Sequence, residues 1–523
     1  MKYKVFIPSA GLGSRLLSYS KHMNKALVTL SNRPAITYII EKFPKDVEIV
    51  VALGYKKESI KDFLNLAYPD RKFVFVDVDK YEGPGSGLGL TMLKCKEHLQ
   101  CPFVFTCNDT IITEDMPLPD YNWMGYVESK DVSLYRSLRL DTNGLVAEIC
   151  SKGATGDVKL YIGLAGIKDY KEFWDAMEKG TAIGSIEVGE SYGLKFLIDK
   201  TIKAIKFDWY DMGNLDSLDK ARKHFVNNDG PNILEKEGEA IWFLNDKVVK
   251  FSIDKSFIEN RVKRASLLAP YVPEIIQNNE SMYAYKKIEG EVFSEKPKLS
   301  EFKYFLKWMD GFWKRKELSK QDSDKFKKIC TEFYKDKTLE RMKQYFARFE
   351  QIDIEEIINN HQVPRLNDIL NKVDWNYIAD GIPARFHGDL HFENILINSS
   401  NSKQPFTLLD WRQDFAGLLE YGDIYYDLAK LNHGLIISHE IISKNLFSVN
   451  HKLDNVSYDF HRKQSLVDCE NYLKTYIVEH GYDLKKVQIL TALIFLNIAP
   501  LHHYPYTLLL FYLGKTMLNE LVN

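Results

Sequence analysis

Short apolar runs alternate with amphipathic segments along the first 218 residues of the chain. Most runs are followed by a segment whose apolar positions recur about every 3.6 residues, as in a helix. The runs read KVFIPSA, VEIVVALG, KFVFVDV and FVFTCND, and the segments between them read RPAITYIIEKF, KKESIKDFLNLA and LGLTMLKCKEHL. This alternation is typical of βαβ units around a parallel sheet. We therefore predict an α/β fold with a Rossmann-like, doubly wound N-terminal domain that binds ligands at the carboxyl ends of its strands.

The pattern changes after residue 225, where the turn-rich stretch FVNNDGPNI interrupts the alternation. A strand-rich patch, EAIWFLNDKVVKFSI, then gives way near Leu299 to long helical patterns such as EFKYFLKWMDGFWKRKEL. Two strand-like segments, ARFHGDLHFENILIN and FTLLDWRQDF, interrupt these helices. We predict one domain over residues 1–226 and a second, two-lobed α+β domain over residues 230–523. Its small lobe spans about 232–298 and its large helical lobe about 299–523.

Composition favours a protein that acts on small molecules. The 523 residues include 70 Lys and Arg against 72 Asp and Glu, which gives no electrostatic reason to bind nucleic acid or an anionic membrane. The six cysteines form no CxxC pair, as expected in a reducing cytosol. Pro500 and Pro505 interrupt the most apolar tract, Val487 to Leu518, which favours buried helices over a membrane span. We expect a cytoplasmic protein without nucleic-acid or membrane partners, and its oligomeric state stays open.

Two glycine-rich stretches lie where the predicted strands end. In SAGLGSRL, Gly11 and Gly13 permit a tight turn that aims N–H groups at an anion, and Arg15 and Lys25 add cations for phosphate oxygens. The second stretch, GPGSGLGL, fits either a linker or a loop whose backbone approaches a ligand. A glycine turn between strand and helix is also common for structural reasons alone, and the absence of a GK[ST] sequence excludes an ordinary P-loop.

Two aspartates are candidate metal ligands. Asp109 follows directly on the run FVFTC, and Asp211 lies about a hundred residues later in WYDMGN. Magnesium prefers a few carboxylate oxygens together with phosphate oxygens and water, so the two carboxylates together fit one Mg²⁺. Either aspartate alone also fits a turn residue that caps a helix.

Taken together, these segments resemble the nucleotidyltransferase family that activates sugar phosphates and phosphocholine, over nearly all of residues 1–222. The resemblance implies that Asp109 and Asp211 hold Mg²⁺, and that the acceptor phosphate meets Lys152. It also implies a nucleoside triphosphate site. In that site, glycines of GPGSGLGL lie near the base and Gly54 lines the crevice. The residues of the site are Gly11, Gly13, Arg15, Lys25, Gly54, Gly85, Gly87 and Gly89. Asn24 stands where the family usually has proline, which leaves the base, among CTP, UTP and GTP, open.

A second constellation lies in the helical part of the chain. HGDLHFEN has the D-x-x-x-x-N spacing of a kinase catalytic loop, with Asp389 and Asn394 at its ends. Asp410 follows in LLDW after an apolar strand, where such enzymes place a second metal-binding carboxylate. The correct order of both matches makes a chance occurrence improbable.

Residues 235–435 resemble the aminoglycoside phosphotransferase and choline kinase family, which has a protein-kinase-like fold. The resemblance implies that Asp389 is the catalytic base, that Asn394 and Asp410 bind Mg²⁺, and that Lys250 contacts the phosphates of ATP. Glu259 fits either a partner of Lys250 or a solvated helix face. For Asp427, in YYDLAKL, we expect a buttress of the catalytic loop.

The two halves suit consecutive reactions. Our leading interpretation is a bifunctional enzyme that phosphorylates a small sugar or polyol with ATP and activates the product with a second NTP for surface polysaccharide synthesis. The first alternative is a choline kinase joined to a CTP:phosphocholine cytidylyltransferase, with Trp411, Tyr421, Tyr425 and Tyr426 as candidates for an aromatic cage. An alternative of another class is a nucleotide-binding regulatory protein with one inactive half.

Overall fold

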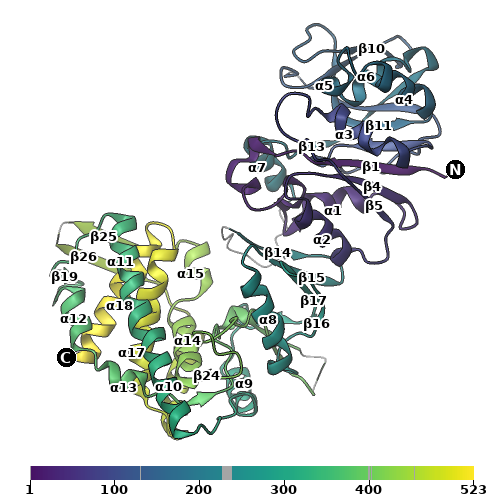
Figure 1. Ribbon diagram of the computed structural model, residues 1–523. Coiled ribbons are helices and arrows are strands. Elements are labelled where there is room, and N and C mark those ends of the chain that lie inside the picture. Colours follow the sequence, from purple (N-terminus) through teal and green to yellow (C-terminus); the bar gives the residue numbers. More distant parts are fainter. Residues whose placement is uncertain (1, 130, 226–237, 399–400, 402, 453) are drawn as a thin grey trace. The chain divides into compact units, whose positions relative to one another are not determined.

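The computed structural model describes residues 2–129, 131–225, 238–398, 401, 403–452 and 454–523. The chain forms two compact units: residues 1–255 with 276–287 form the first, and residues 256–275 with 288–523 form the second. Figure 1 labels their helices and strands. The predicted domain boundary, between residues 226 and 230, lies outside the described residues.

The predicted parallel sheet is present in the first unit. Its strands lie in the order β6-β1-β4-β5 and pair in parallel, with β1 at Lys4–Ser9, β4 at Glu48–Leu53, β5 at Phe73–Asp77 and β6 at Phe103–Thr106. The helices of this half are α1 (Ala35–Ile40), α2 (Lys57–Ala67) and α3 (Leu88–Cys95). Because the chain leaves β1 toward β4 and later returns to the other side of β1 with β6, the strand order reverses between β1 and β6. The carboxyl ends of these two strands therefore flank the place where such sheets bind ligands.

The rest of the sheet is largely antiparallel, which the alternation of runs did not predict. Strand β11 (Lys159–Ile167) pairs antiparallel with β6, with β8 (Asn122–Val127) and with β9 (Ser137–Leu140). A short turn joins β9 to β10 (Val146–Cys150), and Asp141 Oδ1 accepts hydrogen bonds at 2.8 Å from the N–H groups of Asn143 and Leu145. Such a short connection permits antiparallel pairing, whereas parallel strands need a long crossover.

Helices cover both faces of the sheet, as the doubly wound prediction requires. On β1, Val5 and Ile7 belong to one apolar core, together with residues of α1 and α2. Phe6, between them, belongs to the other core, with residues of α3, α4 (Tyr170–Lys179) and α6 (Glu190–Lys195). This follows from the alternation of side chains along a strand.

A second, four-stranded sheet shares the first of these cores. Its order is β14-β15-β17-β16, with β14 at Glu239–Phe243, β15 at Lys247–Ser252, β16 at Ile275–Asn278 and β17 at Met282–Lys286. Trp242 is fully buried; its ring meets that of Phe63 at 5.1 Å, and its Nε1 donates to Thr29 Oγ1 at 3.0 Å. Val249, Phe251 and Met282 lie in the same core. The strand-rich patch is therefore packed on the face formed by α1 and α2.

Replacing Trp242 by alanine is expected to lower the free energy of unfolding of the first unit by about 3–5 kcal/mol, because a large buried ring and a hydrogen bond are lost. Urea unfolding followed by circular dichroism measures this change. Trp242→Phe keeps most of the apolar area and serves as the control. A loss below about 1 kcal/mol for the alanine variant would show that the contact with α2 contributes little.

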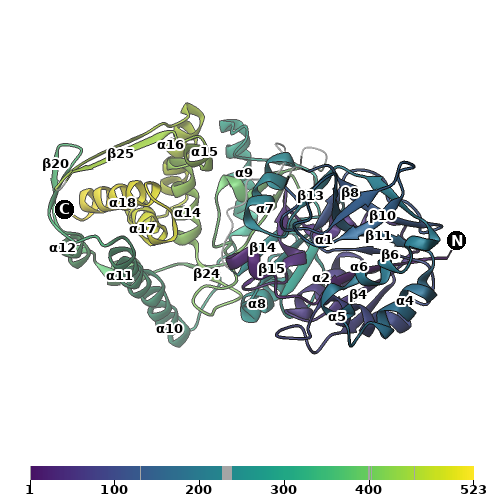
Figure 2. The same ribbon diagram turned by 90° about the horizontal axis from the view of Figure 1, so that it is seen from above.

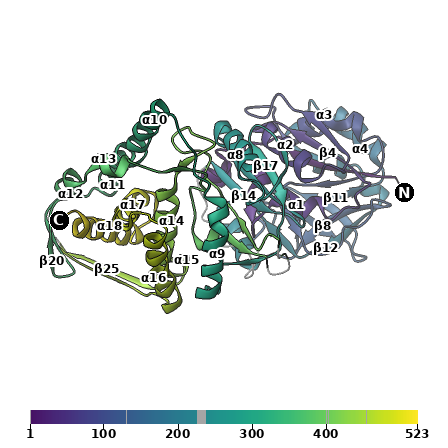
Figure 3. The ribbon, with the colours of Figure 1, turned by 90° about the horizontal axis from the view of Figure 1, so that it is seen from below.

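The second unit is mainly helical, and Figures 2 and 3 show α14, α17 and α18 side by side within it. Its larger helices are α9 (Leu299–Phe312), α10 (Lys320–Thr331), α11 (Lys337–Phe349), α14 (Ile424–Ile436), α16 (Gln464–Glu479), α17 (Leu484–Ile498) and α18 (Tyr506–Val522). The apolar tract forms α17 and α18, as predicted, and most of its side chains are buried. Among the described residues, Leu484–Leu501 is long and apolar enough to span a membrane, but 67% of it is buried inside the protein.

Candidate active sites

The first glycine turn leads from β1 toward Lys25. Gly13 has φ +68°, and a Cβ there would lie 2.9 Å from Cβ of Lys25, so the turn passes close to this lysine. Asn24 holds the turn in place: its Nδ2 donates to the carbonyl oxygens of Ser9 at 2.9 Å and Tyr55 at 2.7 Å. Asn24 thus joins the ends of β1 and β4.

The predicted ligands Asp109 and Asp211 converge with two cations. Lys25 Nζ lies 2.8 Å from Asp109 Oδ2. A Cβ at Gly213 would lie 3.0 Å from Asp211 Oδ1, 3.1 Å from Asp109 Oδ2 and 3.2 Å from Arg15 Nη2. Asp211 reaches this point because β13 (Trp209–Asp211) pairs antiparallel with β7 (Thr110–Ile112), which begins one residue after Asp109.

The charges of this cluster support one another. Burial opposes both ionised forms, but the ion pair raises the pKa of Lys25 and holds the pKa of Asp109 below its ordinary value. The Tyr135 hydroxyl donates to Asp211 Oδ2 at 2.7 Å, and Asn214 Nδ2 donates to the same oxygen at 3.1 Å. Nothing in the spacing of the sequence pointed to Tyr135, because it lies 76 residues before its partner.

The packing of the fold explains two of the glycines in GPGSGLGL. A Cβ at Gly87 would lie 2.3 Å from the carbonyl oxygen of Ile186, and one at Gly89 would lie 2.0 Å from that of Ser185. Both glycines therefore let α3 pack against α5 (Ser185–Val188). Gly85 has φ +78°, and its N–H donates to Glu187 Oε1 at 3.0 Å. The predicted approach of this loop to a nucleotide base stays a prediction.

Gly54 and Lys152 are two further residues of the predicted nucleotidyltransferase site. A Cβ at Gly54 would lie 2.6 Å from the carbonyl oxygen of Ala10, so this glycine lets β4 end against the first glycine turn. Lys152 is exposed in the turn after β10. The predicted contact of Lys152 with an acceptor phosphate remains a prediction.

Glu190 is a buried carboxyl in the first unit, and burial raises its pKa to about 7. Since its pKa in the unfolded chain is near 4.5, folding favours the protonated form. We expect the free energy of unfolding to fall by about 3 kcal/mol as the pH rises from below 4.5 through 7. Glu190→Gln should abolish this loss, whereas Glu97→Gln, at an exposed carboxylate, should keep it. Thermal unfolding between about pH 4 and about pH 8, a range that spans the titration of Glu190, measures both variants. An equal pH dependence in the wild-type protein and the Glu190 variant would contradict the expectation.

In the second unit, a hairpin brings together the residues predicted from the resemblance to kinases. Strand β22 (Ile395–Ile397) follows directly on Asn394 and pairs antiparallel with β23 (Phe406–Leu408), which ends two residues before Asp410. Asn394 Nδ2 donates to the backbone oxygen of Asp389 at 2.9 Å, and Leu409 N donates to the backbone oxygen of Asn394 at 2.8 Å. The three predicted residues thus lie at the same end of one hairpin.

Buried polar groups hold the loop that carries Asp389. The carboxylate of Asp427 accepts from the N–H groups of His387 at 2.7 Å and Gly388 at 2.6 Å, which confirms its expected role as a buttress. Trp313 Nε1 donates to the same carboxylate at 3.0 Å. Burial raises the pKa of Asp427 to about 6. On α8 (Lys255–Leu268), the fully buried Arg264 donates to backbone oxygens of this region, including that of Leu419 at 3.0 Å.

Charged partners of Asp389 come from places that the sequence motif did not indicate. Lys430 Nζ, on α14, lies 2.7 Å from Asp389 Oδ1, and His391 Nε2 lies 3.7 Å from Asp389 Oδ2. Burial would raise the pKa of Asp389, but Lys430 and His391 hold it well below its ordinary value. Burial likewise opposes the charged form of His391, but Asp389 and Glu393 raise its pKa to about 9. Asp389 is therefore a carboxylate with two cationic neighbours.

The structure also shows the surroundings of three other residues of the predicted kinase site, Asp410, Lys250 and Glu259. Asp410 has φ +56° and forms an ion pair with Arg261 on α8. Lys250 is buried in β15 of the first unit. Glu259 is exposed and pairs with Lys263 one turn along its own helix, which is the solvated arrangement.

The candidate aromatic cage for choline is largely part of the core. Trp411 is 1% exposed and donates to the backbone oxygen of Arg261 at 3.0 Å, and Tyr425 and Tyr426 are also buried. Tyr421 faces Lys316, whose Nζ lies 4.6 Å from the centre of the ring.

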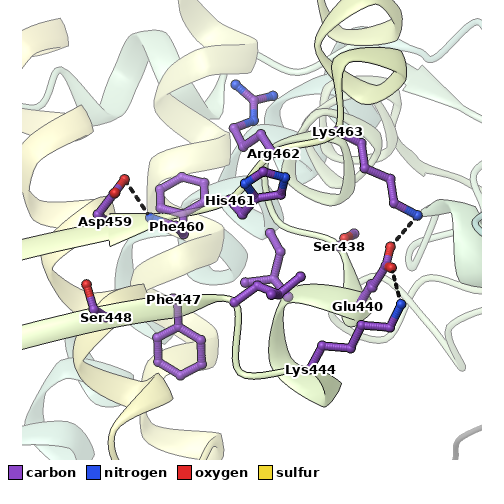
Figure 4. Close-up of a pocket in the computed structure, with 12 residues that line it drawn as sticks. Ser438, Glu440, Lys444, Phe447, Ser448, Asp459, Phe460, His461, Arg462 and Lys463 are labelled. Atoms are coloured by element: carbon purple, nitrogen blue, oxygen red, sulfur yellow. Dashed lines mark hydrogen bonds and ion pairs between the residues drawn. The ribbon is translucent and has the colours of Figure 1, made fainter.

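A pocket of about 690 Å³ lies between α15 (His439–Ser443) and the hairpin of β25 (Phe447–Lys452) and β26 (Asn455–Phe460). Figure 4 shows Glu440 at its wall between Lys444 and Lys463, with which it forms ion pairs. Glu440, Lys444 and Lys463 are thus partnered within the protein, and they do not indicate a ligand class.

The pair of Asp109 and Asp211 is the arrangement to compare with a Mg²⁺ site. Among the described residues, no group of three or more His, Cys, Asp or Glu side chains is arranged to hold a metal ion. A pair of carboxylates beside phosphate-binding cations is the protein's share of a Mg²⁺ site, since substrate phosphates and water supply the other ligands. The convergence of Asp109 and Asp211 at Gly213 meets this requirement.

The N-terminal part of the chain is similar in sequence to nucleotidyltransferases. Over 61 residues the chain is 44% identical to the UTP–glucose-1-phosphate uridylyltransferase of Mycoplasma pneumoniae. This matched segment covers 11% of this chain and 21% of the relative. Over 243 residues it is 26% identical to the bifunctional protein GlmU of Methanococcus aeolicus, which covers 44% of this chain and 56% of that one. The chain thus spans less than two thirds of the length of either relative.

Among solved structures, CTP:phosphocholine cytidylyltransferase from Streptococcus pneumoniae aligns with the chain at a TM-score of 0.37 and 20% identity, over 43% of this chain and 99% of that one. No family model matches the chain. The kinase-like nature of the C-terminal part stays a prediction.

Proposed function

We propose that the chain is a bifunctional enzyme that phosphorylates a small sugar or polyol with ATP and then couples the product to a nucleotide. The observation that carries the nucleotidyltransferase half is the convergence of Asp109, Asp211 and Arg15 at Gly213, with Lys25 paired to Asp109. The kinase half is supported by Asp389, Asn394 and Asp410 at one end of a hairpin.

In the nucleotidyltransferase half, an oxygen of the phosphate monoester attacks the α-phosphorus of a nucleoside triphosphate, and pyrophosphate leaves. The nucleophile is already an anion, so no general base is required. Arg15, Lys25 and the N–H groups of the turn at Gly11 and Gly13 neutralise the charge that develops on the phosphates. Orientation of the two anions against each other supplies much of the rate.

In the kinase half, the hydroxyl oxygen of the acceptor forms a bond to the γ-phosphorus of ATP. The bond from that phosphorus to the bridging oxygen breaks, and ADP leaves with the electron pair. Asp389 orients the hydroxyl and accepts its proton, and Lys430 keeps the carboxylate ionised and in place. Lys250 is proposed to contact the phosphates of ATP.

When bound, Mg²⁺ would neutralise phosphate charge at both sites, held by Asp109 and Asp211 in one and by Asn394 and Asp410 in the other. The second NTP is CTP, UTP or GTP. The product is a nucleoside-diphosphate-linked donor, which suits surface polysaccharide synthesis in the cytoplasm.

The test uses the purified full-length protein with Mg²⁺, ATP and each NTP against a panel of sugars, polyols and amino alcohols. Mass spectrometry should find a phosphorylated alcohol and a nucleotide-linked product, and pyrophosphate should appear in equal amount to the latter. If no alcohol is phosphorylated but a supplied sugar phosphate or phosphocholine leads to release of pyrophosphate, only the nucleotidyltransferase half of the proposal is retained. Neither product with any member of the panel would refute both halves.

A further inference from the structure

Lys430, Lys337 and Arg412, from separate elements, lie close enough to one another to interact electrostatically, and Lys430 pairs with Asp389. Lys430 pairs with the carboxylate from α14. Lys337, at the start of α11, and Arg412, just after Asp410, lie against the same ring: Lys337 Nζ is 4.4 Å and Arg412 Cζ is 5.0 Å from the centre of Phe333. Lys337 Nζ also lies 5.8 Å from the centre of Tyr426, which is one helical turn before Lys430.

Arg412 is fixed directly onto the loop that carries Asp389. Its N–H donates to the backbone oxygen of His387 at 2.9 Å. Gly388 has φ +88°, and a Cβ there would lie 2.6 Å from Cβ of Arg412. The arginine thus packs on the residue that precedes Asp389 in the chain.

These cations exceed the carboxylates available to them. In the part of the chain that the structure describes, no carboxylate lies within ion-pairing distance of Lys337, Arg341 or Arg412. Arg412 Nε donates to the backbone oxygen of Asp414 at 3.0 Å, and Arg341 Nη1 donates to Gln344 Oε1 at 3.0 Å. Burial, together with the nearby Arg412, Lys430 and Arg341, holds the pKa of Lys337 well below its ordinary value, although Asp389 acts against this.

The nearby acidic groups are engaged or exposed. Asp427 accepts from the catalytic loop, Glu393 pairs with His391 at 2.8 Å, and Asp410 pairs with Arg261. On the helical segment around Lys337, the acidic side chains are exposed: Glu332, Asp336 and Glu340. An anion at Lys337 and Arg412 would therefore relieve a local excess of positive charge.

We propose that the alcohol phosphorylated at Asp389 itself carries a negative charge, as a carboxylate or a phosphate, and that Lys337 and Arg412 bind this group. The inference rests on the proposed kinase function and specifies its substrate class: a sugar acid or a phosphorylated polyol. The chemistry is unchanged: the hydroxyl oxygen bonds to the γ-phosphorus of ATP, ADP leaves, and the proton passes to Asp389. Lys430 is a positioning residue for Asp389. Choline is disfavoured, because a quaternary ammonium would meet these cations, and Lys337 already occupies the space over Phe333 and Tyr426.

The first test compares alcohols of matched skeleton. Glucose, glucosamine, glucuronate and glucose 6-phosphate, together with ribitol, ribitol 5-phosphate and choline, are offered to the full-length protein with Mg²⁺ and ATP, and ADP formation and phosphorylated product are measured. We expect kcat/KM for an anionic member to exceed that for its neutral counterpart by about tenfold to a hundredfold. Comparison of the acid with the phosphate ester identifies which anion is bound. Faster phosphorylation of a neutral or cationic member would overturn the inference while leaving the kinase function intact.

The second test uses Lys337→Met, with Lys343→Met, at an exposed lysine of the same helix, as the control. The first variant should raise KM for the anionic alcohol by about tenfold or more and change KM for ATP by less than about twofold. A large increase in KM for ATP instead would assign Lys337 to the nucleotide and overturn the inference.

A binding measurement keeps the inference testable if no phosphorylation is found. Calorimetry with glucuronate and with glucose 6-phosphate, in the presence of Mg²⁺ and ADP, should show saturable binding to the wild-type protein and to Lys343→Met, and loss of binding in Lys337→Met. Such binding without phosphoryl transfer would support the anion site and count against the kinase function. No binding, or binding unchanged by Lys337→Met, would overturn the anion site whether or not the kinase is active.

Discussion

Asp389→Asn is expected to reduce phosphorylation of the acceptor alcohol by about 10²- to 10⁴-fold, because an amide cannot accept the hydroxyl proton. The substitution also removes the negative charge beside Lys430 Nζ, 2.7 Å away, so the local excess of cations grows. Nucleotidyl transfer should stay unchanged, since Asp109 and Asp211 belong to the other compact unit. The two rates are measured separately, as ADP formed with the alcohol and as pyrophosphate formed with the phosphorylated alcohol.

The control is Asp324→Asn, which changes an exposed aspartate of α10 and should leave both rates as they are. Thermal unfolding of each variant separates loss of chemistry from loss of fold. Full phosphorylation by Asp389→Asn would exclude this residue as the base. Loss of both reactions in a folded variant would contradict independent sites.

For the other half, Asp109→Asn is expected to lower nucleotidyl transfer by on the order of 10²- to 10³-fold while phosphorylation continues. The variant loses a carboxylate that faces Lys25 at 2.8 Å and lies beside Arg15 near Gly213. Without it, the two cations lack the negative charge that balances them, and the proposed Mg²⁺ site keeps only Asp211. Pyrophosphate release from each NTP with a supplied sugar phosphate measures the effect.

Asp120→Asn, at an exposed aspartate of the same unit, is the matched control. Because loss of one partner of a partly buried ion pair also destabilises the fold, the thermal midpoint of Asp109→Asn must be compared with that of the wild-type protein. An unchanged rate of pyrophosphate release in the folded variant would remove Asp109 from the proposed site.

The sequence indicated the local elements of both candidate sites. Apolar runs with regular spacing predicted β1, β4, β5 and β6, and the position of Asp109 after the last of these placed it at the edge where parallel sheets bind ligands. The motif around Asp389 and Asn394 is equally local, since a loop and one short hairpin contain it together with Asp410. Patterns of this kind are readable because each depends on neighbours within a few residues of the chain.

The side chains that contact these residues could not be predicted from the sequence. Tyr135 at Asp211, Lys430 at Asp389 and Arg261 at Asp410 each come from another element, and no spacing connects the members of each pair. The glycines at 87 and 89 looked suited to a ligand, but their close approach is to the backbone of α5. A glycine in the sequence indicates that another group approaches the backbone closely, and only the fold shows whether that group is a ligand or another part of the chain.

The sequence by itself determined the alternation of strands and helices, the two acidic motifs and the glycine turns, because side-chain periodicity and backbone freedom act over a few residues. Only the tertiary structure decided that the sheet of β14–β17 buries Trp242 against Phe63, and that half of the large sheet is antiparallel. It also decided that Lys430 pairs with Asp389, and that Lys337 and Arg412 lie against the ring of Phe333. These contacts join residues far apart in the chain, and their pairing depends on which apolar faces and charges fit together when the whole chain packs.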